Sequence, residues 1–119
     1  MTTEIKIDSN GNIRYFEDGR FHREDGPAIE WNNGVKEYYI NGKLHRVDGP
    51  AIEREKGINE WYINDVRHRE DGPAIEYPNG DEEWWLNDQL HREDGPAIIE
   101  DDIKMWYING VWMKTTYGN

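Results

Sequence analysis

Histidine and aspartate recur in this chain at spacings that raise the question of metal binding. His22, His45, His68 and His91 lie 23 residues apart, and each is followed three residues later by an aspartate. Equivalent positions in neighbouring repeats of a strand meander are about 9.5 Å apart, because two strands of about 4.8 Å separate them. One zinc ion needs all its ligands about 2 Å away. We therefore expect no metal and no other cofactor, and instead a structural hydrogen bond within each repeat, such as that between His68 and Asp71.

The arginine after each histidine could bind a phosphate or a carboxylate. Because an acid lies within two residues of Arg23, Arg46, Arg69 and Arg92, an ion pair within the same segment is the better prediction. The sequence has no cysteine, no nucleophile-elbow motif, no phosphate-binding glycine loop and no HExxH, and no pair stands out among its 25 acids. The chain is predicted not to be an enzyme.

Acidic residues are concentrated in the second half of the chain. Residues 1–59 have a net charge of −2 and residues 60–119 a net charge of −9, which together make the formal −11. Two acid clusters at equivalent turns flank an aromatic pair, and the predicted partner-binding residues are Asp81, Glu82, Glu83, Trp84, Trp85, Glu100, Asp101 and Asp102. Solvated turns would also explain these acids. The sharper hypothesis is a docking surface that fills a basic groove which normally takes nucleic acid.

These residues belong to a repeating pattern of short strands and turns. Two-residue turns of a kind that tolerates positive φ are predicted at Asp18-Gly19, Asn41-Gly42, Asn64-Asp65, Asn87-Asp88 and Asn109-Gly110. A second reversal is expected at each Asp-Gly-Pro, where the glycine should adopt dihedrals that other residues avoid. A looser third turn follows at residues 32–34, 55–57 and 78–80, whereas residues 100–102 replace it in the fourth unit and should differ in shape.

Aromatic residues occur in pairs at one position of each unit. The pairs are Tyr15-Phe16, Tyr38-Tyr39, Trp61-Tyr62, Trp84-Trp85 and Trp106-Tyr107. Neighbours in a strand point to opposite faces of a sheet, so each face should carry one aromatic row. We expect one row to form the core and the other to be partly covered by the His-Arg loops. An exposed aromatic binding face is the alternative.

The pattern as a whole predicts an all-β protein, an elongated antiparallel meander of β-hairpin repeats with a 23-residue period. A single domain over residues 1–119 is expected, with four repeats and two half-unit caps. The caps are residues 1–14 and 106–119, and the repeats are residues 15–37, 38–60, 61–83 and 84–105.

The repeat resembles a known family. Residues 37–51 read Glu-Tyr-Tyr-Ile-Asn-Gly-Lys-Leu-His-Arg-Val-Asp-Gly-Pro-Ala, which is similar to the Leu-His-Arg-x-Asp-Gly-Pro-Ala variant of MORN-type repeats. The resemblance covers about residues 15–112 and implies an elongated sheet of hairpins that serves as an interaction module, as in members from phages, giant viruses and bacteria. The usual pattern has glycine where this chain has Arg23, Arg46, Arg69 and Arg92, so the lipid binding proposed for MORN proteins carries over poorly.

The sequence favours a non-enzymatic protein-binding repeat module, and the resemblance suggests a phage or viral accessory inhibitor of a host nucleic-acid-binding or defence protein. The predicted partner is a basic protein, because the acidic surface repels nucleic acid and anionic membranes. A binder or sponge for a nucleotide-like small molecule and a structural self-associating module, including a homodimer, are the alternatives. The first residues lack the basic and apolar blocks of a signal peptide, which predicts a cytoplasmic protein, in the host cytoplasm if a phage encodes it.

Overall fold

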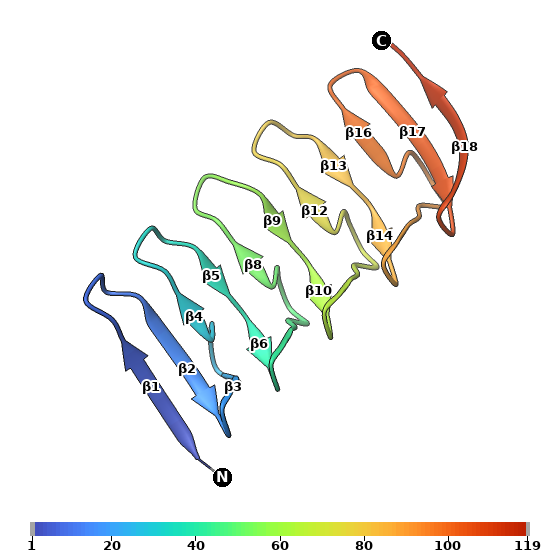
Figure 1. Cartoon of the computed structure of the whole chain (residues 1–119). Coiled ribbons are helices and arrows are strands. Elements are labelled where there is room, and N and C mark those ends of the chain that lie inside the picture. The colour runs from blue at the N-terminus through green and yellow to red at the C-terminus, as the bar shows by residue number, and fades with distance from the viewer. Residues whose placement is uncertain (1, 119) are drawn as a thin grey trace.

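The protein is a single extended layer of antiparallel strands (Figure 1). The computed structural model describes residues 2–118, which measure 51 × 26 × 17 Å along the principal axes. The described residues contain strands and turns but no helix, and hence no helix that could span a membrane. The predicted all-β meander of hairpins is confirmed.

Eleven strands lie side by side along the long axis of the main sheet, every neighbouring pair antiparallel. In spatial order they are β1 (Thr3–Ile7), β2 (Ile13–Glu17), β4 (Ile29–Glu30), β5 (Lys36–Glu37), β8 (Ile52–Glu53), β9 (Asn59–Glu60), β12 (Ile75–Glu76), β13 (Glu82–Glu83), β16 (Ile98–Glu100), β17 (Ile103–Ile108) and β18 (Val111–Thr116). Each repeat therefore adds two strands to this sheet.

Short hairpins project from one edge of the main sheet. They pair β2 with β3 (Arg20–Phe21), β6 (Tyr39–Ile40) with β7 (Lys43–Leu44), β10 (Tyr62–Ile63) with β11 (Val66–Arg67), and β14 (Trp85–Leu86) with β15 (Gln89–Leu90). The two-residue turns that close them are those predicted from the sequence. Asn41 and Gly42, for example, have φ of 52° and 80°, and the other three turns, like the Asn109-Gly110 turn between β17 and β18, have positive φ at both residues as well. This backbone twist matches the twist of the flanking strands.

The fourth repeat differs from the others, as expected. Asp101, with φ of 52°, and Asp102 form a tight turn that joins β16 directly to β17. Because this turn continues the ladder, β17 runs unbroken for six residues, whereas the equivalent part of the third repeat is divided into β13 and β14.

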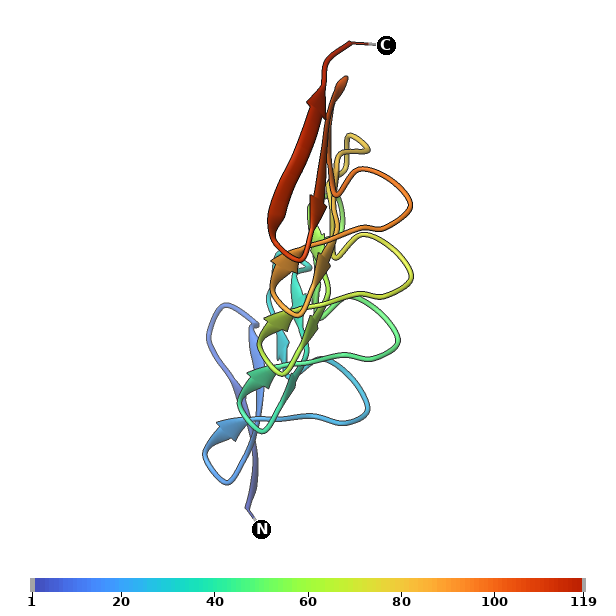
Figure 2. The ribbon, with the colours of Figure 1, turned by 90° about the vertical axis from the view of Figure 1, so that its right-hand side faces the viewer.

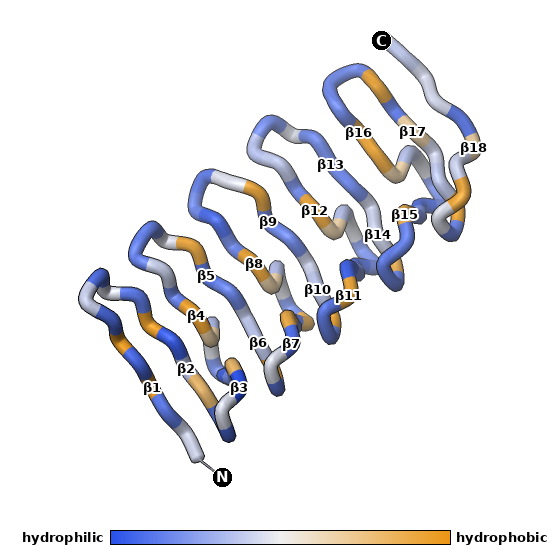
Figure 3. Tube along the Cα trace, in the orientation of Figure 1, coloured by the Kyte–Doolittle hydropathy of each residue, from blue (hydrophilic) through white to orange (hydrophobic). Residues whose placement is uncertain are grey.

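The fully covered side chains are small. Ala28, Ala51, Ala74 and Ala97 have no exposed surface, and Ile29 and Ile75 are the other buried hydrophobic residues of the described chain. Figure 3 shows the consequence as short hydrophobic patches at β4, β8, β12 and β16 within a largely hydrophilic chain. The prediction that one aromatic row forms the core is wrong. A single-layer sheet has no second layer to cover a large ring, so both aromatic rows are only half-buried.

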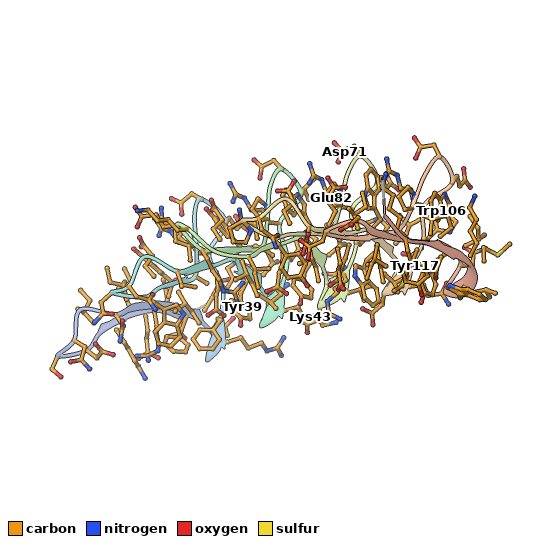
Figure 4. The ribbon with its side chains drawn as sticks, turned by 90° about the horizontal axis from the view of Figure 1, so that it is seen from above. Tyr39, Lys43, Asp71, Glu82, Trp106 and Tyr117 are labelled. Carbon is orange, nitrogen blue, oxygen red and sulfur yellow. The ribbon has the colours of Figure 1, made fainter. Side chains whose placement is uncertain are left out.

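The sheet has two chemically different faces. The loop face carries the His-Arg-x-Asp-Gly-Pro-Ala loops, residues 22–28, 45–51, 68–74 and 91–97, which bulge to one side in Figure 2. The hairpin face is the opposite one. Figure 4 looks along the layer and shows Asp71, Glu82 and Trp106 on the loop face and Tyr39 and Lys43 on the hairpin face.

Candidate interaction surface on the loop face

One aromatic row lies beneath the loops, and each ring is covered by a cation. The guanidinium carbons of Arg23, Arg46, Arg69 and Arg92 lie 4.1, 4.0, 3.9 and 3.8 Å from the ring centroids of Tyr15, Tyr38, Trp61 and Trp84, respectively. Lys114 on β18 takes the same place over Trp106, at 4.4 Å. The expectation that the His-Arg loops cover one aromatic row is confirmed. Stacking of this kind fixes the arginine flat on the sheet.

Each loop arginine is also held by acceptors of its own repeat. Arg46, for example, donates from Nε to Asp48 (3.2 Å) and from a terminal nitrogen to the Pro50 carbonyl (3.2 Å) and to Glu53 (2.7 Å). The ion pair with the loop aspartate recurs in the other three repeats at 3.0 to 3.1 Å. The predicted ion pair within the loop is confirmed. The charge of these arginines is neutralised within the loop, so they are not available to bind an external anion.

The glycine of Asp-Gly-Pro has a different role from the predicted one. Gly26, Gly49, Gly72 and Gly95 do not have positive φ. A Cβ at these positions would lie 2.7 to 2.9 Å from Cζ of the stacked arginine, closer than real Cβ atoms come. The glycine is therefore required by the close approach of the arginine, and the prediction that it supplies unusual dihedrals is wrong.

The loop histidine does not bond the aspartate of its own repeat, so that prediction is wrong too. Nδ1 of the histidine accepts a hydrogen bond from the backbone N–H that opens the next hairpin turn. The four bonds are Asn41 to His22 (2.9 Å), Asn64 to His45 (3.1 Å), Asn87 to His68 (3.0 Å) and Asn109 to His91 (2.9 Å). The aspartate pairs with the loop arginine instead, and the histidine links its loop to the hairpin of the next repeat.

The loop face is hollowed into four grooves, which we number along the chain. The second, third and fourth lie between successive loops, whereas the first lies between the loop of residues 22–28 and Thr3 of β1. Their volumes are about 560, 640, 510 and 450 Å³ for the first to the fourth groove. The floor of the fourth groove is Trp84, Leu86 and His91, and the second and third have the equivalent ring, isoleucine and histidine. The floors of these three grooves thus contain an aromatic ring and an aliphatic side chain, with an arginine stacked on the ring.

The rims of the grooves are acidic. The side chains of Glu24, Glu70 and Glu93 are 84, 82 and 85% exposed, and the loop aspartates beside them are exposed to the same degree. Within the described residues no lysine or arginine lies within ion-pair distance of these glutamates, and Nε2 of the loop histidine lies 3.6 to 3.7 Å away. Val47 takes the place of the glutamate in the second loop and is 80% exposed. The rim is therefore a row of free carboxylates with one apolar interruption.

The structure divides the predicted acidic site between the two faces. Glu82 accepts a bond from Trp84 Nε1 and faces the loop side, whereas Glu83 accepts one from Trp85 Nε1 and faces the hairpin side, each at 2.9 Å. Asp81 is brought next to Asp101, whose backbone N–H it accepts at 3.0 Å. Glu100, Asp101 and Asp102 are exposed at the tip of the turn between β16 and β17, which we call the last turn because it is the last at that edge of the sheet. Three of the predicted acids are thus engaged by neighbouring donors. Trp84 lines the fourth loop-face groove, whereas Asp81 and Glu82 line a separate pocket of about 260 Å³.

The hairpin face contains a row of three carboxylates, of which the sequence analysis had singled out only Glu83. Glu37, Glu60 and Glu83 each accept two side-chain bonds. The donors are Trp31 and Tyr39 for Glu37, Arg54 and Tyr62 for Glu60, and Tyr77 and Trp85 for Glu83. The sequence pattern that marks this row is a glutamate two residues before the second aromatic residue of each pair, with a side-chain donor six residues before the glutamate. In the fourth repeat Met105 replaces the glutamate and Glu100 replaces the donor. Glutamate and donor are thus lost together, as expected if their hydrogen bond has a structural role.

Burial and these hydrogen bonds raise the pKa values of the tyrosines in this row. Desolvation, and then the hydrogen bond to Glu83, raise the pKa of Tyr77 to about 12. The pKa values of Tyr39 and Tyr62 are raised in the same way, by desolvation and by their bonds to Glu37 and Glu60. Each of these hairpin-face glutamates thus has both of its oxygens engaged by a protein donor. Among residues 2–118 no cluster of three or more His, Cys, Asp or Glu side chains could hold a metal ion.

No protein-family model matches this sequence, and no curated protein matches it. The MORN-type resemblance therefore stays a prediction from the repeat motif, and evidence on function comes from the two faces themselves.

Proposed function

We propose that this protein is a non-enzymatic binding module that holds a basic segment of another protein along the grooves of its loop face. The observation that carries this proposal is the recurrence of one groove in every repeat, with an apolar floor and free carboxylates at the rim. The loop arginines are neutralised by their own aspartates and glutamates, so the charge presented to a partner is negative. Lysine and arginine, with apolar stems and cationic heads, complement such a groove.

A module of this kind would act as an inhibitor when the segment it holds is one that its partner needs for nucleic acid. Nucleic-acid-binding proteins carry exposed lysine and arginine clusters that suit an acidic row. The phage or viral origin and a host defence target stay predictions that rest on the MORN-type resemblance. The acids of the last turn, Glu100, Asp101 and Asp102, remain the competing docking surface.

The test compares two variants with the same change in charge. In the first, Glu24, Glu70 and Glu93 are replaced by glutamine, and in the second, Glu100→Gln is combined with Asp101→Asn and Asp102→Asn. Binding of a fluorescent oligolysine peptide is measured at low salt and at about 0.5 M salt, where exposed charges are screened. We expect the rim variant to bind about tenfold more weakly, at roughly half a kcal/mol for each lost contact, and the tip variant to bind nearly as the parent does.

Each outcome decides between the surfaces. Weak binding by the tip variant alone would move the docking surface to the last turn. Equal binding by all three proteins would overturn the proposal that carboxylates recognise the partner. Unchanged thermal unfolding shows that neither set of substitutions has disturbed the fold, since all the replaced side chains are exposed.

A small-molecule ligand is the second candidate, because the groove volumes lie within the range of ligand sites, about 300–1,000 Å³. A nucleotide-like anion would meet carboxylates at every rim, so the geometry supports it less well than a cation. Thermal unfolding with and without nucleotides separates the two, because a bound ligand stabilises the protein by about 2.7 kcal/mol at a hundredfold excess over its dissociation constant.

Self-association is the third candidate and involves other residues. The end strands β1 and β18 carry the exposed Ile5, Ile7, Val111, Trp112 and Met113. Each of these strands has a neighbour on one side only, and an unpaired strand edge can pair with another copy. A molar mass that rises with concentration in light scattering would favour this function.

A further inference from the structure

The spacing and chemistry of the grooves also restrict the conformation of the segment they would bind. We infer that the loop face takes a polyproline II segment with lysine or arginine at every third residue, lying along the long axis of the sheet. This inference rests on the proposed function and adds to it the shape and periodicity of the partner.

The first argument is distance. Each repeat adds two strands to the main sheet, so equivalent grooves follow one another at about 9.6 Å, twice the strand spacing of about 4.8 Å. The long dimension of 51 Å agrees with a stack of eleven strands at this spacing. A polyproline II helix rises about 3.1 Å per residue, so three residues span about 9.3 Å. Over four grooves the accumulated mismatch is only about 1 Å.

The second argument is direction. A polyproline II helix has three residues per turn, so every third side chain points to the same side and can enter successive grooves. In a β-strand, residues three apart point to opposite sides, and residues two or four apart are about 6.6 or 13 Å apart. An α-helix returns to the same side after seven residues, or about 10.5 Å, which is out of step by almost 3 Å at the fourth groove. Of these three conformations, polyproline II fits best in both respects.

The third argument is chemistry. In the fourth groove the stem of a lysine would lie against Leu86 and beside the Arg92-covered ring of Trp84. Its ammonium group would lie near the unpaired Glu70 and Glu93, with the arginine-paired Asp71 and Asp94 at the same rim. Two prolines between successive basic residues keep the segment extended and lower the entropy lost on binding. Aromatic floors are also what proline-rich ligands meet in other recognition grooves.

Val47 makes the grooves unequal in their number of carboxylates. It lies beside both the second and the third groove, so each of these has three carboxylates from the loops, whereas the fourth has four. Because Val47 is an exposed apolar side chain in a row of acids, it weakens the attraction for a cation at the centre of the surface. Val47 is therefore a specificity-determining residue.

The periodicity is tested with two peptides of identical composition, length and charge. The first repeats Lys-Pro-Pro four times, and the second repeats Lys-Lys-Pro-Pro-Pro-Pro twice. We expect the full-length protein to bind the first peptide about tenfold more tightly, because its lysines meet all four grooves in register. Equal affinities would overturn the inference while leaving the proposed function in place. If neither peptide nor oligolysine binds, the proposed function fails as well.

The role of Val47 is tested by a pair of opposite substitutions. Val47→Glu should bind the Lys-Pro-Pro peptide about threefold more tightly, and Glu70→Val about threefold more weakly, as a single exposed charge contact would give. Asp102→Asn is the control, since it removes one carboxylate that lines no groove. If Val47→Glu raises the affinity for both peptides equally, the effect comes only from the change in net charge, and the positional role of Val47 is refuted.

Discussion

The loop arginine stands at the centre of each repeat because it makes several contacts at once. Arg46 stacks on Tyr38, pairs with Asp48 and Glu53, and lies so close to Gly49 that a side chain there would collide with it. Exposed ion pairs of this kind contribute little singly. Stacking and pairing together hold one rotamer, and that rotamer forms the wall of a groove.

Gly49→Ala tests this view of the glycine. The new Cβ would lie 2.8 Å from Cζ of Arg46, so the guanidinium must shift from its place over the ring, and we expect a loss of about 1 kcal/mol in the free energy of unfolding. The measurement is urea denaturation of the single variants and the double variant with Arg46→Ala. Coupling is expected, since the three atoms nearest to the new Cβ all belong to the arginine. Additive effects would show that the glycine is needed for another reason.

Tyr77 gives the protein a dependence on alkaline pH. Its pKa is about 12 in the folded state against 10.0 ordinarily, because burial and the bond to Glu83 disfavour the phenolate. The unfolded chain therefore loses this proton first, and the stabilisation, complete below pH 10, declines as the pH rises towards 12. We expect the stability difference between the parent and Tyr77→Phe to shrink between pH 8 and pH 11 in urea denaturation. A difference that is constant with pH would contradict this.

At the level of elements, contacts between a hairpin and the preceding loop join the repeats. The turn of β6 and β7 donates from the Asn41 amide to His22 and from the Gly42 amide to the Phe21 carbonyl. In the same way, the Asp88 amide of the hairpin that follows β14 donates to the carbonyl of Arg67. Strands of two residues are too short to be stable alone. Their stability comes from neighbours, as in other repeat proteins.

His68 allows this coupling to be measured. His68→Phe keeps a flat ring but leaves the exposed amide of Asn87 without its protein acceptor, and we expect a loss of about 0.5–1.5 kcal/mol. His68→Gln is the matched control, because its carbonyl oxygen can still accept a hydrogen bond, and it should lose less. Equal losses for both variants in chemical denaturation would mean that ring packing matters and the acceptor does not.

The molecule as a whole is elongated because, within the described residues, no second layer of helices or strands packs on the sheet, and only the loops cover part of one face. Its Cα radius of gyration is 16.7 Å, whereas a compact domain of this length would have about 13.5 Å. Small-angle X-ray scattering at low concentration should give a radius close to the larger value. A value near that of a compact domain would contradict the single layer, and a much larger one would indicate copies joined through β1 or β18.

Local patterns in the sequence were sufficient to predict the meander, its turns and the pairing of each arginine with its aspartate. Turn residues and charges two positions apart act over a few residues, so their consequences can be read without the rest of the chain. The 23-residue period then extended one unit to the whole molecule. The same reasoning placed an aromatic row under the loops, because strand neighbours alternate between faces.

The partners of the histidines, the reason for the glycines and the faces of the acids were decided only by the tertiary structure. His22 bonds a residue 19 positions away, and Gly49 is constrained by a side chain that folds back over it. Glu82 and Glu83 are adjacent in the sequence but point to opposite faces, so what reads as one acidic cluster is two surfaces. Contacts between repeats depend on how the strands stack, and stacking brings together residues that sequence spacing leaves apart.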